Sequence, residues 1–247
     1  MPGQDQTDPT SEFAKELARQ LPVKAVYDDV ASPAAKQTGQ ILNDIVKTIQ
    51  LALAPLQFLG AYQDRLRKFI DTSVRRVAPE QRISPALQIL GPVVEGIRYE
   101  PEGTPIDDMF SELLSRSMDS NRVDEAHPAY PIIIKQLSSD EAKILASLKS
   151  QEYEYTYTRD YDRTTNLFLG LAKIEVDALP RDGLVFPKNV SFYMQHLNQL
   201  GLAGIFQVGN QEPLFGEEPR VQTGVRVKSS YRLTELGARF VRACIKI

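Results

Sequence analysis

The chain has little of the side-chain chemistry that metal sites and nucleophilic active sites need. Among its 247 residues there are one cysteine, two histidines and no tryptophan. A single cysteine excludes an intramolecular disulfide framework and a cysteine-based zinc site. The sequence also lacks the GxxxxGK[ST], GxGxxG, HExxH, GxSxG and CxxC patterns. We therefore expect no cofactor and no metal, and we find no catalytic motif.

Long apolar runs and an excess of one charge are also missing. The chain has 29 basic and 32 acidic residues, which argues against non-specific nucleic-acid binding by the whole protein. The longest uncharged apolar stretch runs from Thr48 to Gln63, with Pro55 in its middle. It is shorter than the roughly 20 residues of a membrane span, so a buried core helix is the first interpretation and membrane contact the alternative.

The first residues, Met1 to Ser11, are polar and acidic, with no apolar segment of the kind that a signal peptide has. We therefore expect a cytoplasmic protein, associated with a membrane only when it is activated.

The remaining reactive residue types have structural interpretations. His127 follows two acidic residues, as a general acid or base would require, but no nucleophile motif accompanies it. We interpret it as a hydrogen-bonded turn residue. His196 lies in a helical pattern and is expected to be partly buried. Cys244, on the last predicted helix, is expected to be packed rather than reactive.

The first 150 residues follow helical patterns. Ser32–Pro33 is typical of a helix start, and apolar residues then recur every four positions. A second helical pattern, from Leu56 to about Val77, has a basic end. An apolar stripe followed by cations is typical of a surface that binds a partner or anionic lipid. The candidate residues for such an interaction are Ile41, Ile45, Ile49, Leu53, Arg65, Arg67 and Lys68.

Three further helices are predicted from their first residues. Ser84–Pro85 opens one that passes through Ile97, and Thr104–Pro105 opens the next. Ser138 or Ser139 caps a helix to about Leu148, with a glutamate near the capping-box position.

Acidic residues gather in the helix after Thr104 and beyond it. Their positions are Asp107, Asp108, Glu112, Asp119, Asp124 and Glu125. They are interpreted as a solvated face, or as a face opposed to the basic Arg65–Arg76 segment within one chain or between copies. A hidden hydrolase, with a carboxylate cluster assembled by the fold, stays open as a further alternative.

The pattern changes near Ser150. Glu152 to Asp160 alternates as a strand does, and Asn189 to Leu200 has helical spacing. Two strands follow around a loop rich in glycine, proline and glutamate, and Thr234 caps a last helix. The segment from Arg163 to Pro187 stays open, with Leu167 to Leu171 either strand or helix. A helix, a hairpin and a helix in this order resemble a winged-helix domain.

The last strand and helix are basic, and their nucleic-acid candidates are Arg226, Lys228 and Arg232. A positive patch of this kind binds phosphates. The helix that would enter the major groove, from Lys188 to Leu200, has only one cation, however. A structural or protein-binding wing is therefore favoured over a DNA-binding one.

Together these patterns predict a mainly α chain, α+β overall. Residues 1–30 form a polar lead and a first helix, residues 31–137 a helical domain, and residues 138–247 a winged-helix-like domain with a β-hairpin.

Two blocks of sequence resemble the Abi-alpha, or abortive infection alpha, family of bacterial proteins. One is SPAAKQTGQILNDIVKTIQLALAPLQFL, from Ser32 to Leu59; the other, from Ile83 to Leu145, contains DMFSELLSRSMDS and AHPAYPIIIKQLSSDEAKIL. The resemblance covers residues of about 30–146. It implies a role in anti-phage defence, in which an infected cell stops growing or dies before the phage matures. It supplies no catalytic residues.

The sequence therefore predicts a defence protein that acts by binding a phage or host protein, without visible catalysis, and that forms homo-oligomers if its apolar stripes are exposed. Two alternatives remain. In one, the apolar helix of residues 41–62 inserts into a membrane on activation. In the other, the C-terminal domain is a winged-helix DNA-binding regulator.

Overall fold

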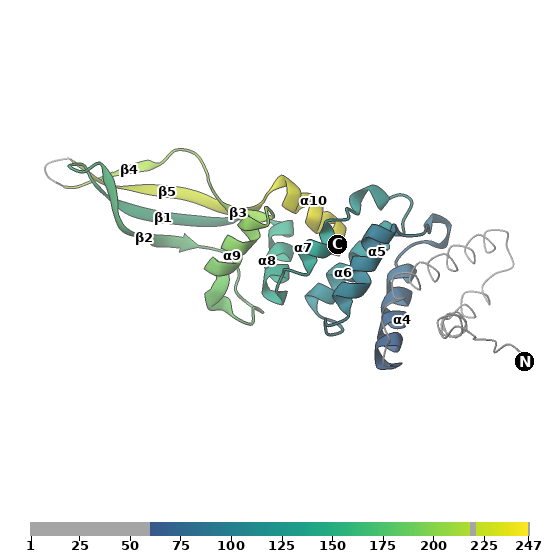
Figure 1. The fold of residues 1–247 in the computed structure, drawn as a ribbon. Helices are drawn as coiled ribbons and strands as arrows, with labels where there is room; N and C mark the ends of the chain where they lie inside the picture. Colours follow the sequence, from purple (N-terminus) through teal and green to yellow (C-terminus); the bar gives the residue numbers. More distant parts are fainter. Residues whose placement is uncertain (1–59, 218–220, 247) are drawn as a thin grey trace, which may run out of the picture. The chain divides into compact units, whose positions relative to one another are not determined.

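The structure, a computed structural model, describes residues 60–217 and 221–246 (Figure 1). The predicted apolar stripe of Ile41, Ile45, Ile49 and Leu53 lies outside the described residues. Contacts between Cα atoms divide the chain into two compact units. The first comprises Met1–Gln136 with Arg242–Ile247, and the second comprises Leu137–Val241.

The first unit is helical. Its described helices are α4 (Gly60–Arg75), α5 (Leu87–Ile97), α6 (Pro105–Ser117) and α7 (Tyr130–Ile134). α6 contacts each of the other three, as Figure 1 shows. Because it is surrounded in this way, every residue from Met109 to Ser117 is buried, the polar ones included. Those polar groups need partners inside the protein.

Two predicted helix starts in the first 150 residues are confirmed. The Thr104 hydroxyl accepts a hydrogen bond from the Asp107 backbone N–H at 3.1 Å, and it caps α6. Ser138 and Glu141 form a reciprocal capping box at the start of α8 (Ser139–Ser150). The predicted cap at Ser84 is wrong, because α5 begins at Leu87 after an uncapped Ala86.

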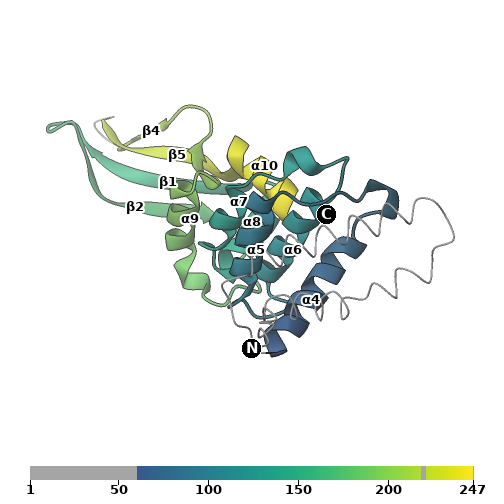
Figure 2. The same ribbon diagram turned by 45° about the vertical axis from the view of Figure 1, so that its right-hand side comes forward.

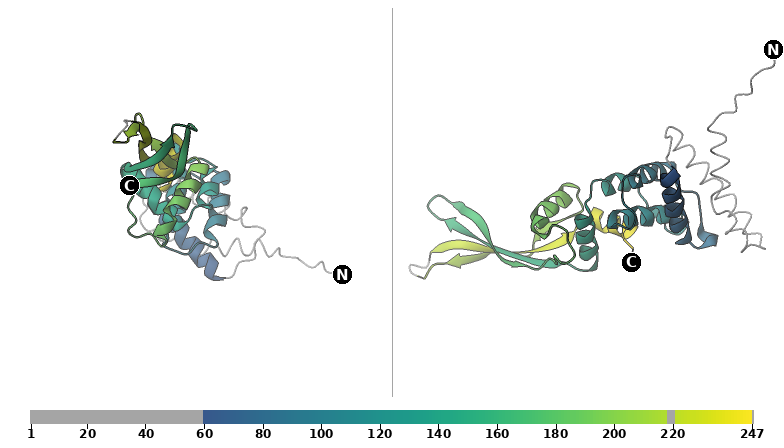
Figure 3. Two further views of the ribbon diagram at one scale, coloured as in Figure 1. Left: turned by 90° about the vertical axis from the view of Figure 1, so that its left-hand side faces the viewer. Right: turned by 90° about the horizontal axis from the view of Figure 1, so that it is seen from below.

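The second unit is an antiparallel sheet with helices at one end. Its helices are α8, α9 (Val190–Gln199) and most of α10 (Glu235–Cys244). Its strands are β1 (Tyr153–Asp162), β2 (Leu167–Asp177), β3 (Ala203–Gln207), β4 (Glu212–Phe215) and β5 (Gln222–Leu233). The strand order is β2-β1-β5-β3, and β4 also pairs with β5. Figure 2 shows β2 along one edge of this sheet, and Figure 3 shows its twist from two further sides.

The strand register assigns side chains to the two faces of the sheet. Tyr157 of β1 lies opposite Ile174 of β2 and Val227 of β5, so these three side chains share one face. α8 meets this face near its base, where the Ser147 hydroxyl and the Tyr153 phenol lie 2.7 Å apart. The neighbouring residues in each strand point to the opposite face, which carries Lys173 of β2 and Arg226 of β5.

The predicted winged-helix fold is wrong. The described residues contain seven α-helices and a five-stranded antiparallel sheet, an α+β arrangement. The segment that the sequence left open contains β2, and β1 lies between β2 and β5. The expected wing is thereby part of a larger sheet. The predicted strand of Glu152–Asp160, the helix of Asn189–Leu200 and the Thr234 cap are confirmed.

Candidate functional site

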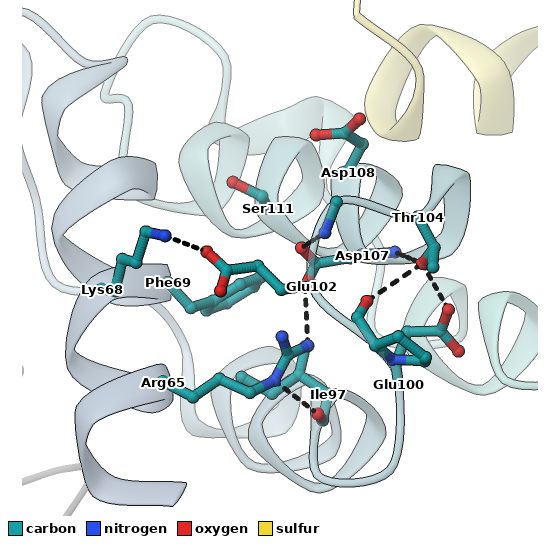
Figure 4. A network of polar contacts seen from close by, with 12 residues as sticks. Arg65, Lys68, Phe69, Ile97, Glu100, Glu102, Thr104, Asp107, Asp108 and Ser111 are labelled. Atoms are coloured by element: carbon teal, nitrogen blue, oxygen red, sulfur yellow. Dashed lines mark hydrogen bonds and ion pairs between the residues drawn. The ribbon is translucent and has the colours of Figure 1, made fainter. Parts of the chain in front are cut away.

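The basic residues of α4 face the acidic start of α6 within one chain, as Figure 4 shows. Arg65 lies with its Nη2 3.0 Å from Asp107 Oδ1, and its Nε donates to the Ile97 carbonyl at 3.3 Å. Lys68 forms an ion pair with Glu102 in the loop before α6, and this hydrogen bond lowers the pKa of the Glu102 carboxyl. The sequence favoured a solvated face for the acidic residues, and this interpretation is wrong for Asp107; the alternative, a face opposed to the basic segment, describes the contact.

The third cation of this predicted group is also paired. Arg67 Nη1 lies 3.4 Å from Asp64 Oδ1 on the same helix. The three cations that the sequence singled out beside the apolar stripe are therefore each in an ion pair. A search of the described residues finds no helix both long and apolar enough to cross a membrane.

Among the described residues of the first unit, the most buried charged side chain is that of Arg116, which is 2% exposed. Its Nε and Nη2 lie 2.9 and 2.8 Å from one oxygen of Glu112, and its Nη1 pairs with Glu125. The second Glu112 oxygen accepts from Arg76 at 3.1 Å. This alternating chain of charges satisfies the buried guanidinium, as burial of an ion requires.

A pocket of about 280 Å³ borders this cluster. Its walls include Arg76, Glu112, Arg116, Asp119, Arg122 and Lys246. Because acidic and basic groups line it together and pair with one another, the pocket offers neither a free cation cluster for a phosphate nor an unpaired base for proton transfer. The carboxylates proposed for a hidden hydrolase do not converge here. Asp107 pairs with Arg65 of α4, and Asp108 lies 3.7 Å from Arg76, which follows α4. Asp119 accepts from the Asn121 backbone N–H at 2.9 Å.

The remaining reactive residue types occupy structural positions. His127 Nδ1 accepts from the Ala129 backbone N–H at 3.1 Å, as a turn residue does. His196 Nδ1 lies 2.6 Å from a carboxylate oxygen of the buried Glu141. Burial raises the pKa of the Cys244 thiol well above its usual value, which makes a thiolate nucleophile unavailable. No group of three or more metal-ligating side chains occurs in the part of the chain that the structure describes.

The three nucleic-acid candidates all lie on β5. Arg226 forms two hydrogen bonds to Glu175 of β2, at 2.7 and 3.1 Å. Lys228 Nζ lies 2.6 Å from Glu212 Oε1, and this contact lowers the pKa of the Glu212 carboxyl. The Arg232 guanidinium lies over the Phe206 ring at 4.9 Å. Each cation has a partner within the sheet, so the strand does not present a row of free positive charges.

The feature that sequence reasoning missed is the exposure of β2. Its first nine residues are all exposed, and Leu171 is 91% exposed. The register with β1 distributes its large apolar side chains over both faces of this edge strand, with Phe168 and Ile174 on one face and Leu167 and Leu169 on the other. We call these side chains together the β2 surface: Leu167, Phe168, Leu169, Leu171 and Ile174. A signal was present, since LFLGL is an apolar run in a segment that otherwise reads as a strand. The run alone does not say whether a strand is central or lies at an edge.

β2 also lacks a neighbour on its outer side among the described residues, because it ends the strand order. Two irregularities interrupt its pairing with β1: one at Glu175, and one between Leu169 and Lys173 that includes Gly170 with φ of 64°. Leu171, which is 91% exposed, lies within the second irregularity. Exposed apolar side chains beside an unpaired ladder are typical of a surface that binds another protein.

Comparison with known proteins gives one match. Residues 57–244 match the family described as "Abortive infection alpha". No curated protein and no solved structure matches the chain. The match extends through both units and includes the whole sheet, so β2 and the α4–α6 ion pairs lie within the part of the chain that the family describes.

Proposed function

Because the chain belongs to the abortive infection alpha family, we propose that it is a bacterial anti-phage defence protein that acts by abortive infection. We propose further that it acts through protein contacts made by the β2 surface and not by catalysis. In this mode of defence the infected cell stops growing or dies before the phage matures.

The observation that carries this proposal is the exposure of the β2 surface. Five large apolar side chains project from one edge strand. A long exposed edge strand of this kind invites aggregation unless another chain covers it. Large apolar side chains at exposed positions add nothing to the stability of the fold, so their occurrence on β2 favours a binding role.

The charges around the β2 surface favour a protein over a membrane or a nucleic acid. Lys173 Nζ lies 2.8 Å from Asp160 Oδ2, and Glu175 binds Arg226. Acids and bases thus occur in pairs beside the apolar side chains. Anionic lipid and nucleic acid select an excess of cations, whereas a protein partner is able to match alternating charges.

The experiment is a phage challenge of bacteria that carry the gene. Protection at low multiplicity of infection, with collapse of the culture at high multiplicity, is the result that abortive infection predicts. Survival of individual infected cells would point to a different mode of defence. The absence of protection across a broad phage panel would count against the proposed function.

A further inference from the structure

We infer that the partner of the β2 surface is a second copy of this chain, joined by antiparallel pairing of the two β2 strands around a two-fold axis at Ile174. This inference rests on the proposed function, in which β2 makes a protein contact. It names the occupant, the orientation and the register of that contact.

The first argument is the unpaired ladder. β1 uses the hydrogen-bonding groups on one side of β2, and no described strand uses those on the other side. A second β2 strand satisfies these groups, as strand addition does in other complexes. Antiparallel pairing about a two-fold axis puts the same surface on both sides of the contact. The contact closes on itself, which removes the exposed edge of both copies and prevents open-ended aggregation.

The second argument is self-complementary charge. With the axis at Ile174, residues whose numbers add to 348 lie opposite one another. This places Lys173 opposite Glu175 of the partner copy, and Glu175 opposite the partner's Lys173. Both side chains lie on the face of the sheet that carries Arg226. Lys173 pairs with Thr158 of β1, which in turn pairs with Arg226 of β5, and Glu175 binds Arg226. The resulting row alternates in sign: Asp160, Lys173, Glu175 of the partner copy and its Arg226.

Neighbouring registers lack this match. An axis at Leu171 sets Lys173 opposite Leu169 of the other copy, and an axis at Lys173 sets two lysines opposite one another. Opposite charges directly across a strand pair are favourable and like charges are unfavourable. Exposed ion pairs contribute little free energy, so we expect the charges to select the register and the apolar side chains, Ile174 at the axis among them, to supply affinity.

A charge-reversal pair tests the register. Lys173→Glu creates two glutamate–glutamate contacts in a homodimer, and Glu175→Lys creates two lysine–lysine contacts. When the two variants are mixed, each position 173 again faces an opposite charge at position 175. Light scattering after size-exclusion chromatography should give twice 27.7 kDa for the wild type, a mass shifted toward the monomer for each single variant at the same concentration, and the dimer mass for the mixture. A monomeric wild type, or single variants that dimerise as well as the wild type, would overturn the inference.

A disulfide trap gives a second readout that does not depend on charge. In this register the two copies of residue 174 are directly opposite, with Cα atoms about 4.5–5.5 Å apart, within disulfide range. Ile174→Cys should therefore form an intersubunit disulfide on oxidation. Leu171→Cys is the matched control, because its two copies would lie about 20 Å apart. Cross-linking of Leu171→Cys but not Ile174→Cys would contradict the register. Cys244 is buried and does not compete.

The same variants separate failure of the inference from failure of the proposed function. Phage protection should be lost with either charge variant alone and return when both are expressed together. If the wild type is a monomer but Ile174→Lys still abolishes protection, the second-copy inference fails and the β2 contact stands. If the single variants are monomers that protect fully, the dimer stands and the functional role of β2 fails.

Discussion

Arg226 on β5 holds Glu175 on β2 with two hydrogen bonds, at 2.7 and 3.1 Å, across the intervening strand β1. The forked geometry of a guanidinium matches a carboxylate in this way. The contact raises the pKa of Arg226 and lowers that of Glu175. A cation that the sequence suggested for phosphate binding is thus used to join the edge strand to the sheet.

This pairing predicts weak interaction with nucleic acid. At physiological salt we expect no binding of duplex DNA tighter than about 10⁻⁴ M, the weak end of non-specific binding. Replacement of Arg226 and Lys228 by glutamine should leave the result unchanged. Fluorescence anisotropy with a labelled duplex measures it. Binding in the micromolar range that weakens with salt and with the double replacement would revive the DNA-binding alternative.

The buried cluster around Arg116 predicts a large loss of stability when one partner is removed. Arg116→Met leaves the Glu112 and Glu125 carboxylates without their shared cation, and breaking a buried pair in this way costs about 3–5 kcal/mol. Urea unfolding measures the free energy. Arg239→Gln, which breaks the exposed pair with Glu235, is the control and should unfold like the wild type. Equal stability of the two variants would show that the Arg116 cluster does not support the fold.

Substitution by alanine should have opposite effects on stability at two of the glycines. A Cβ atom at Gly237 would lie 1.7 Å from the Leu202 carbonyl oxygen, a backbone atom. Gly237→Ala should therefore lower the free energy of unfolding by about 2–3 kcal/mol. A Cβ atom at Gly91, inside α5, would meet nothing within 4 Å. Gly91→Ala should raise stability by up to about 1 kcal/mol. Thermal unfolding measures both effects. A Gly237→Ala variant that is more stable than Gly91→Ala would contradict this packing.

Asp140 predicts a pH-dependent contribution to stability. Burial opposes its ionisation, but hydrogen bonds from the Val185 and Phe186 backbone N–H groups and from the Tyr193 phenol outweigh it and lower the pKa. A lowered folded-state pKa stabilises the fold above the unfolded value of about 3.9, and the contribution is lost as the pH falls through the folded pKa.

The corresponding variant is Asp140→Asn. It should be less stable than the wild type at pH 7, and the difference should shrink as the pH falls below about 4. Chemical unfolding at several pH values measures this difference, in which the other carboxyl groups cancel. A difference that stays constant down to pH 2 would mean that the charge of Asp140 contributes nothing.

Local signals in the sequence predicted three helix caps correctly, at Thr104, Ser138 and Thr234. The hydroxyls of Thr104 and Ser138 each accept a hydrogen bond from a backbone N–H group in the first turn of the following helix. Such caps can be predicted because they depend on only a few neighbouring residues. The cap predicted at Ser84 is wrong although Ser84, like Thr104, is followed by a proline; the Ser/Thr–Pro pair alone therefore does not identify a helix start. The facing of Arg65 and Asp107 was only the less favoured of two interpretations, because charge alone does not distinguish a solvated acidic face from a paired one.

The sheet is harder to predict from the sequence because strands that pair with one another lie far apart along the chain. Tyr153 pairs with Tyr231, 78 positions later, and no local pattern encodes that choice. The local order of helix, hairpin and helix therefore resembles the smaller winged-helix fold. The exposure of Leu171 likewise follows from the edge position of β2 and its irregular pairing, and both are properties of the assembled sheet.

The most direct test of the account compares Ile174→Lys with Ile132→Lys in the phage challenge. Ile174 and Ile132 are 58% and 57% exposed, but Ile174 lies on the β2 surface and Ile132 lies on α7. Both proteins should fold and accumulate like the wild type. The account predicts that Ile174→Lys loses protection and that Ile132→Lys retains it. Full protection by Ile174→Lys would contradict the central claim that defence acts through the β2 surface.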